Sequence, residues 1–271
     1  MTPDDPARSL QNEAYLSPAF LDKFGFASRL ACELGLRMDF TIGNGWSYGG
    51  PHITPDLAAS RLRFDRREVT PGRTSVARPV AYENDRLIAA FVARGSLQET
   101  DPNTFRELDT SGDGPIPLPA DGGPRTVVFC FSSHTGQAVK RAALGADGYV
   151  LDHYSRAAIE THFREVGDKL LAAAVAGGIH AIFCDSLEVY EADWTVDMLT
   201  EFRKRRGYDL RAFLPLLEFD AGERTEVLRR DFGRNLTELY EERFLVPMRE
   251  WATRNNVLFL VLSDGSAHGS H

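Results

Sequence analysis

Apolar residues along the chain follow a helical spacing in some stretches and form short continuous runs in others. After Ser17 and Pro18, the apolar positions between Phe20 and Leu34 recur every three or four residues, which predicts a helix that starts at Ser17 and ends at Gly35. The short apolar runs predict buried strands over 36–42, 148–151, 179–184 and 256–262. Helical spacing predicts further helices over 137–143, 156–176, 195–206, 210–217 and 224–255, the last with a break near Pro247.

Residues 61–131 depart from this alternation of strands and helices. Strand-like runs at 86–93 and 126–131 are separated by clusters of Pro, Gly, Asp and Ser, and no helical period is present. Elsewhere the alternation favours a parallel sheet covered by helices. About four core strands are visible where a complete barrel has eight. The predicted fold is therefore α/β, an incomplete (β/α) TIM-like barrel with a β-rich insertion at 61–131 between its early strands.

This pattern predicts one large domain over residues 15–262. Residues 1–14 and the small, polar residues 263–271 are expected to be a disordered N-terminal segment and a disordered tail. A net charge of -8 argues against a nucleic-acid partner, because neutralising phosphates requires a basic surface. No apolar run reaches the ~18 residues that span a bilayer, and no signal peptide is recognisable, so we expect no membrane partner.

Polar residues that directly follow the predicted core strands are the candidates for chemistry. In a barrel the active site lies at the carboxyl ends of the strands. Those ends carry Asn44 and Trp46 after the first strand, Asp152 and His153 after the second, Asp185 and Glu188 after the third, and Ser263 and Asp264 after the last. The three cysteines are widely spaced in apolar stretches, so the sequence indicates neither a disulfide framework nor a zinc motif.

Glu188 is the main candidate for a catalytic residue. Hydrolysis of a glycosidic bond needs a carboxylic acid that protonates the leaving oxygen, and the apolar residues around Glu188 suit such an acid. Asp185 would orient it or bind a sugar hydroxyl. The competing interpretation is that Asp185 caps a turn and Glu188 is a solvated charge. For Asp152 and His153 the alternative is a helix N-terminal cap.

The glycine-rich loop 43–51 lacks the spacing of nucleotide-binding motifs. Its aromatic residues Trp46 and Tyr48 suit a platform for a sugar ring. The alternative is a tight turn with a structural tryptophan. Lys140 and Arg141 are interpreted as part of a solvated helix face.

Several of these segments together resemble the α-L-rhamnosidases of glycoside hydrolase family 106. The resemblance rests on Tyr15–Pro18, Leu34–Phe40, Gly43–Pro51, Gly148–Ser155 and Cys184–Glu188, which occur in the family's order. It implies a barrel catalytic domain that hydrolyses terminal α-L-rhamnosides with inversion, with calcium nearby, although no metal ligands are evident in the sequence. It also implies a parent protein that is periplasmic or secreted.

Carried over residue by residue, the resemblance makes Glu188 the general acid. The same comparison places five residues in the sugar-binding shell: Asn44, Trp46, Asp152, His153 and Asp185. The chain departs from the family in one important respect, since we find no convincing counterpart of the second catalytic carboxylate. We therefore expect a truncated fragment of the barrel. The alternatives are a barrel hydrolase for another deoxy sugar or a uronic acid, and a non-catalytic carbohydrate-binding remnant.

Overall fold

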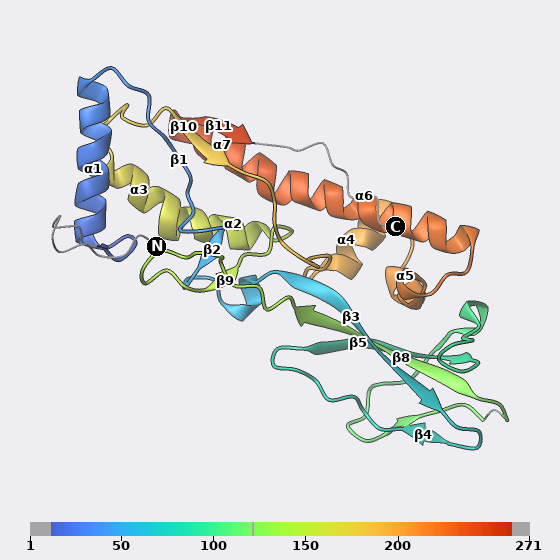
Figure 1. Cartoon of the computed structure of the whole chain (residues 1–271). Coiled ribbons are helices and arrows are strands. Elements are labelled where there is room, and N and C mark those ends of the chain that lie inside the picture. Colours follow the sequence, from blue (N-terminus) through green and yellow to red (C-terminus); the bar gives the residue numbers. More distant parts are fainter. Residues whose placement is uncertain (1–11, 121, 262–271) are drawn as a thin grey trace. The chain divides into compact units, whose positions relative to one another are not determined.

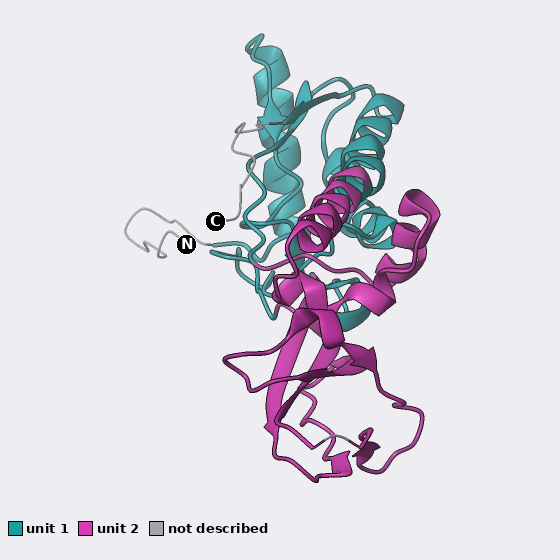
Figure 2. Ribbon diagram, turned by 90° about the vertical axis from the view of Figure 1, so that its right-hand side faces the viewer, with its two compact units in different colours: residues 1–59, 136–190, 239–271 teal, residues 60–135, 191–238 magenta. Residues whose placement is uncertain are grey.

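A computed structural model describes residues 12–120 and 122–261 and shows a mixed α/β fold (Figure 1). The chain divides into two compact units, coloured separately in Figure 2. The first contains residues 1–59, 136–190 and 239–271, and the second contains residues 60–135 and 191–238. Each unit is therefore assembled from separate stretches of the sequence.

The first unit contains a three-stranded parallel sheet. Strands β1 (Asp39–Phe40), β10 (Ala181–Cys184) and β11 (Leu258–Val261) lie in the order β1-β10-β11. Three of the predicted core strands are confirmed, each shorter than its apolar run. The described residues contain no closed barrel, so the α/β class is observed and the partial barrel stays a prediction.

Helices of the first unit begin with α1 (Pro18–Glu33). The Ser17 hydroxyl accepts a hydrogen bond from the Phe20 amide at 3.2 Å, which confirms the predicted N-cap. The predicted helix at 156–176 is observed as α2 (Arg156–His162), a π-helical turn (Phe163–Gly167) and α3 (Asp168–Ala173). The buried faces of these helices join the apolar core around Ile182 and Trp251.

The long C-terminal helix has the break that its sequence predicts. It consists of α6 (Glu223–Tyr240), a π-helical turn (Glu241–Leu245) and α7 (Val246–Arg254). Pro247 directly follows the irregular turn. It has no N–H to donate to the preceding turn of the helix, which explains why the regular α-helical pattern is interrupted there.

Residues 148–151 do not belong to the parallel sheet, contrary to the prediction. Here β9 (Tyr149–Val150) pairs antiparallel with β2 (Gly49–Gly50). A Cβ atom added to Gly49 would overlap the Tyr149 carbonyl group, so the two backbones approach more closely than a side chain would allow. The glycines of the 43–51 loop thus serve backbone packing.

The predicted helix at 137–143 is also wrong. The Val139 amide donates to the Gly148 carbonyl at 3.0 Å, and Lys140 exchanges two backbone hydrogen bonds with Trp46 at 2.7 and 2.9 Å. These cross-chain partners satisfy the backbone groups that a helix would have paired internally, so the segment is extended.

The second unit contains a four-stranded antiparallel sheet in the order β3-β8-β5-β6. Its strands are β3 (Ser60–Val69), β8 (Arg125–His134), β5 (Arg86–Arg94) and β6 (Arg106–Glu107), and a small separate pair is formed by β4 (Ser75–Val76) and β7 (Ile116–Pro117). The β-rich character predicted for 61–131 is therefore observed. The central strands β5 and β8 are buried on both faces, which explains their continuous apolar sequences.

Helices complete the second unit. In addition to α6 they are α4 (Met198–Arg206), a 3-10 turn (Leu210–Phe213) and α5 (Pro215–Glu218), close to the ranges predicted from the sequence. Two further 3-10 turns lie in loops, Pro55–Leu57 in the first unit and Pro102–Thr104 in the second. Across the part of the chain that the structure describes, no helix has both the length and the apolar character needed to cross a membrane.

Candidate active site

Three segments of the first unit meet at the loop that follows β10. Trp46, in the loop after β1, lies opposite Lys140 of the extended 137–143 segment in an antiparallel bridge. The Trp46 indole N–H donates to the Ser186 carbonyl at 2.9 Å. Trp46 is therefore fixed directly against the loop that carries Asp185 and Glu188.

Gln137 fixes the same loop from the other segment. Its side-chain Nε2 donates to the Glu188 carbonyl at 2.8 Å, and its Oε1 accepts from the Tyr190 amide at 2.8 Å. The amide side chain thus donates to one backbone carbonyl and accepts from one backbone N–H, as the backbone of an adjacent β-strand would. Gln137 was missed at the sequence level because it was assigned to a helix that does not form.

The Glu188 carboxylate is open to solvent, with 46% of its side chain exposed. Lys140 Nζ lies 3.5 Å from Glu188 Oε2 and donates to the Tyr190 hydroxyl at 2.9 Å. This hydrogen bond with Tyr190 is the main reason why the pKa of Lys140 lies above its usual range. Lys140 is thus not part of a helix face: it places a positive charge beside Glu188.

Asp185 shares the loop with Glu188 and is exposed. Its Oδ1 accepts a hydrogen bond from the Ser186 amide at 2.7 Å, which is the turn-capping role considered from the sequence. That bond leaves the other carboxylate oxygen, Oδ2, as a further acceptor in the same loop.

Asn44 lies in the same loop as Trp46, and its side chain forms a hydrogen bond with the backbone of that loop. The Asn44 Nδ2 donates to the Gly49 carbonyl at 3.0 Å, whereas its buried Oδ1 has no partner among the described residues. The side chain lines an open groove of about 590 Å³ together with Phe20, Phe24 and Arg141. Asn44 can therefore still accept a hydrogen bond.

Tyr48 is not a sugar platform. Its ring is 1% exposed, and its hydroxyl donates to the Phe183 carbonyl at 2.9 Å while accepting from Thr41 Oγ1 at 3.2 Å. Burial raises the pKa of Tyr48 well above its usual value. Tyr48 is a core residue that ties the Trp46 loop to the end of β10.

Asp152 and His153 lie in the buried interior, each 4% exposed. Asp152 Oδ1 accepts from the Tyr154 amide at 2.8 Å, just before α2, which corresponds to the capping alternative. The His153 ring packs 4.7 Å from that of Phe244, and burial lowers the pKa of His153 to about 3. A sugar could reach neither residue in this arrangement without a local opening.

Metal binding finds little support in the described residues. No group of three or more His, Cys, Asp or Glu side chains within 12–120 and 122–261 has a geometry that could hold a metal ion. Calcium takes six to eight oxygen ligands and usually several carboxylates. The described residues offer no such group of acidic side chains, so calcium stays a prediction from the family resemblance, and we derive no catalytic step from it.

Comparison with known proteins identifies the family and the fold that this chain shares. A family model described as alpha-L-rhamnosidase, glycoside hydrolase family 106, matches residues 108–269. The structure of a rhamnosidase from Novosphingobium sp. PP1Y superposes on 93% of the chain with a TM-score of 0.69 and 16% sequence identity. This second likeness demonstrates a shared fold.

A protein named "Putative beta-glucuronidase" from Formosa agariphila is 25% identical over 292 residues, which cover 91% of this chain. The chain spans 25% of the length of that relative and 42% of the length of the matched rhamnosidase structure.

Proposed function

The chain belongs to glycoside hydrolase family 106, the α-L-rhamnosidases, and we propose that it supplies the general acid, Glu188, for the cleavage of terminal α-L-rhamnosides with inversion. The observation that supports this role is the double attachment of the Glu188 loop. Trp46 holds it at the Ser186 carbonyl and Gln137 holds it at the backbone of Glu188 and Tyr190. The carboxylate is thereby positioned while it stays accessible.

The reaction requires a proton and a water molecule. In the proposed step, the Glu188 carboxylic acid donates its proton to the glycosidic oxygen as the bond between this oxygen and the anomeric carbon breaks. Water attacks the opposite face of the sugar, and a second carboxylate accepts its proton. In inverting enzymes the two carboxyl groups lie about 6.5–9.5 Å apart to leave room for that water.

This chain alone is proposed to provide part of a catalytic barrel. The parallel strands β1, β10 and β11 and the partial coverage of both relatives support that interpretation. The second carboxylate is expected from a segment of the larger catalytic domain. Asn44, Trp46 and Asp185 stay proposed members of the sugar-binding shell, and Asp152 and His153 are proposed to join it only after a local opening of the buried interior. Of these, Trp46 and Asp185 have the direct structural link to Glu188.

Substitution of Glu188 tests the proposal in the longest protein that contains this chain. Glu188→Gln is expected to lower kcat/KM by roughly 100- to 10,000-fold, the usual contribution of a general acid. The loss should be smaller for an aryl rhamnoside than for an alkyl rhamnoside, because a good leaving group needs less protonation. Glu160→Gln, on the exposed face of α2, is the matched control.

Unchanged kcat/KM in Glu188→Gln would contradict the acid role. NMR that identifies which anomer of the sugar is released first tests inversion separately. Release of the anomer with retained configuration would exclude inversion. Rhamnose binding without turnover in wild type would instead favour the carbohydrate-binding remnant.

A hydrolase for an acidic sugar is the second candidate. It is favoured by the relative from Formosa agariphila, whose name refers to glucuronide cleavage and whose match extends over most of this chain. Parallel assays with an aryl α-L-rhamnoside and an aryl β-D-glucuronide separate the two. Faster release from the glucuronide would replace the first candidate.

A further inference from the structure

Helices α1 and α3 of the first unit lie side by side, and a groove between them contains none of the residues around Glu188 (Figure 1). The groove is open to solvent and has a volume of about 700 Å³. Six of its nine lining residues lie on one face of α1, and the other three belong to α3. The six are Pro18, Leu21, Asp22, Gly25, Phe26 and Arg29.

Two opposite charges in this groove have no partner. Asp22 and Arg29 are both exposed, and neither side chain forms a hydrogen bond or an ion pair within residues 12–120 and 122–261. Seven residues separate them, which corresponds to two turns and about 10.5 Å along a helix, so they are too far apart to pair with each other. Lys169, the third charged lining residue, already lies 3.0 Å from Glu165 Oε2.

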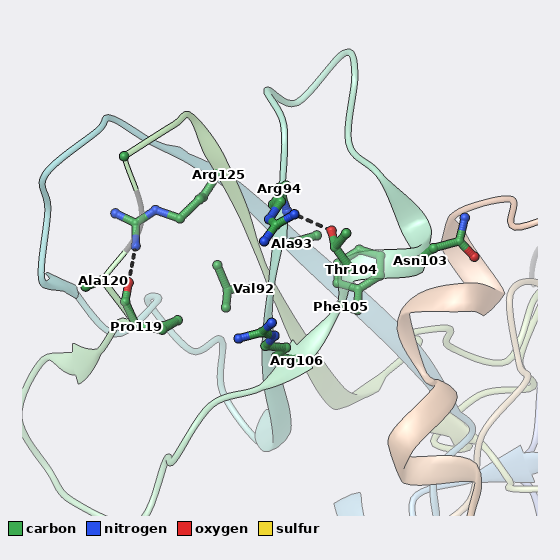
Figure 3. A pocket seen from close by; sticks show the side chains of 11 residues that line it. Val92, Ala93, Arg94, Asn103, Thr104, Phe105, Arg106, Pro119, Ala120 and Arg125 are labelled. Atoms are coloured by element: carbon green, nitrogen blue, oxygen red, sulfur yellow. Dashed lines mark hydrogen bonds between the residues drawn. The ribbon is translucent and has the colours of Figure 1, made fainter.

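The charges of this groove differ from those around a pocket of the second unit, which Figure 3 shows. There the two terminal nitrogens of Arg125 donate to the carbonyls of Pro119 and Arg73 at 2.6 and 2.7 Å. Such a guanidinium is held by its own chain. Asp22 and Arg29, in contrast, are both available to another molecule.

Phe26 adds an apolar contact between the two charges. It is 58% exposed, and Leu30, one turn further along α1, is 39% exposed. Exposed aromatic and aliphatic side chains that adjoin each other and have charged neighbours are typical of a surface that binds another protein. The partner must therefore offer an apolar group with an acidic and a basic residue on either side of it.

The α1 helix itself meets this requirement. In a two-fold symmetric contact both copies use the same surface, and two α1 helices that cross the symmetry axis run antiparallel. Asp22 of one copy then lies opposite Arg29 of the other, and the reverse pair forms at the same time. The midpoint between positions 22 and 29 falls between Gly25 and Phe26, so the two Phe26 rings meet at the centre of the contact.

We propose that this face of α1 is the interface through which two copies of the chain form a symmetric dimer. Two Asp22–Arg29 pairs fix the antiparallel register, and the Phe26 pair supplies the apolar centre. Because the contact uses one helix and the edge of a second, we expect a reversible dimer with a dissociation constant in the micromolar range. The inference does not depend on the proposed function, since none of these residues contacts the Glu188 loop.

Sedimentation equilibrium of the full chain tests the contact by charge reversal. Every sample carries Leu260→Lys, because the exposed Leu260 on β11 offers a second surface for association. The chain with this change alone should still dimerise. Asp22→Arg and Arg29→Asp should each weaken dimerisation by about tenfold or more, because two attractive pairs become repulsive in each symmetric dimer.

An equimolar mixture of the two variants tests the antiparallel register. In a mixed dimer, the arginine introduced at position 22 lies opposite the aspartate introduced at position 29, and the unchanged Arg29 and Asp22 face each other as well. The mixture should therefore dimerise within about threefold of the chain with intact α1, although neither variant does so alone. Recovery in the mixture also demonstrates that both variants are folded.

Arg249→Asp is the matched control for Arg29→Asp, since it makes the same change of charge at an exposed position on α7 and should leave dimerisation unchanged. Equal weakening by these two substitutions would overturn the inference, as would a chain with intact α1 that stays monomeric up to about 1 mM. A mixture of folded variants that stays as weak as each variant alone would overturn it too.

Circular dichroism checks that each variant folds. Should a charge reversal prevent folding, Phe26→Ser provides the test instead, because it removes only the central ring from an exposed position. This substitution should weaken dimerisation by about tenfold or more, as expected for an aromatic residue at the centre of an interface. Unchanged dimerisation in Phe26→Ser would overturn the inference.

Discussion

His162 illustrates a residue that burial keeps neutral. Its Nε2–H donates to the Ile42 carbonyl at 2.6 Å, so the other ring nitrogen accepts from His52 Nε2–H at 2.9 Å. Burial, followed by the proximity of His52, lowers the pKa of His162 to about 3, and burial lowers that of His153 to about 3 as well. These rings can be packed and hydrogen-bonded only as long as they stay unprotonated.

The free energy of unfolding should therefore decrease as the pH is lowered below about 6.5. Histidine in the unfolded chain binds protons below about pH 6.5, whereas the folded chain binds them only near pH 3, so the unfolded state gains protons across that window. Each buried histidine then removes about 1.4 kcal/mol of stability per pH unit. Urea denaturation at several pH values between 7.5 and 4 measures this slope.

Substitution identifies the groups responsible for the slope. His162→Gln, which keeps a donor for the Ile42 carbonyl, should be less stable near pH 7 and should show a shallower decline toward acid pH. His180→Gln, at a partly exposed position paired with Asp39, should leave the slope unchanged. A wild-type stability that is flat from pH 7.5 to 4 would refute the assignment.

Individual residues also show what could be read from the sequence. The position of Glu188 after a buried strand was predictable, because strand ends follow from apolar patterns. The partners Gln137 and Lys140 were not, since their contacts depend on long-range backbone pairing with Trp46 and on the loop after β10. Asp152 and His153 follow a strand too, but that strand pairs with β2 and points them into the core.

The packing of α1 on α3 depends on Gly25. A Cβ atom at this position would lie 2.5 Å from the Ala173 carbonyl oxygen, too close for any real contact. Ser28, one turn later, accepts from the Val175 amide at 3.0 Å. The helices can make this approach only because position 25 lacks a side chain.

Gly25→Ala should therefore destabilise the protein by about 1–3 kcal/mol, the cost of overpacking a close contact. Gly233→Ala is the matched control on α6, where an added Cβ meets nothing within 4 Å. There the substitution should stabilise by roughly 0.5–1 kcal/mol, because alanine favours the helix. Chemical denaturation compares the two, and a Gly25→Ala variant as stable as wild type would show that α1 readily shifts.

Elements with strong local signals were predictable, and those decided by distant partners were not. Ser17 and Pro18 specify the start of α1 locally, and the apolar run of β10 specifies a buried strand. The segment 137–143 has the apolar spacing of a helix. It is nevertheless extended, because its backbone forms hydrogen bonds with Gly148 and Trp46. The sequence likewise does not reveal that 148–151 pairs antiparallel with two glycines.

At the scale of the whole molecule, the parallel sheet is the feature most relevant to a barrel. Both the class of fold and the β-rich segment were predictable, whereas strand order was not, since it depends on long-range pairings such as that of Asp39 with Ala181. Among the described strands, β11 pairs only with β10. Its residues Leu258, Leu260 and Val261 are 54%, 40% and 44% exposed.

An apolar edge strand of this kind favours association with another strand. We expect the wild-type chain to self-associate as its concentration rises, and Leu260→Lys to reduce that association because a charge on an edge opposes strand addition. Val227→Lys adds the same charge at an exposed position of α6 and should have a smaller effect. Sedimentation velocity over a concentration series measures the difference. A wild-type chain that sediments as a monomer throughout, or equal effects of the two lysines, would show that this edge is not the surface through which the chain associates.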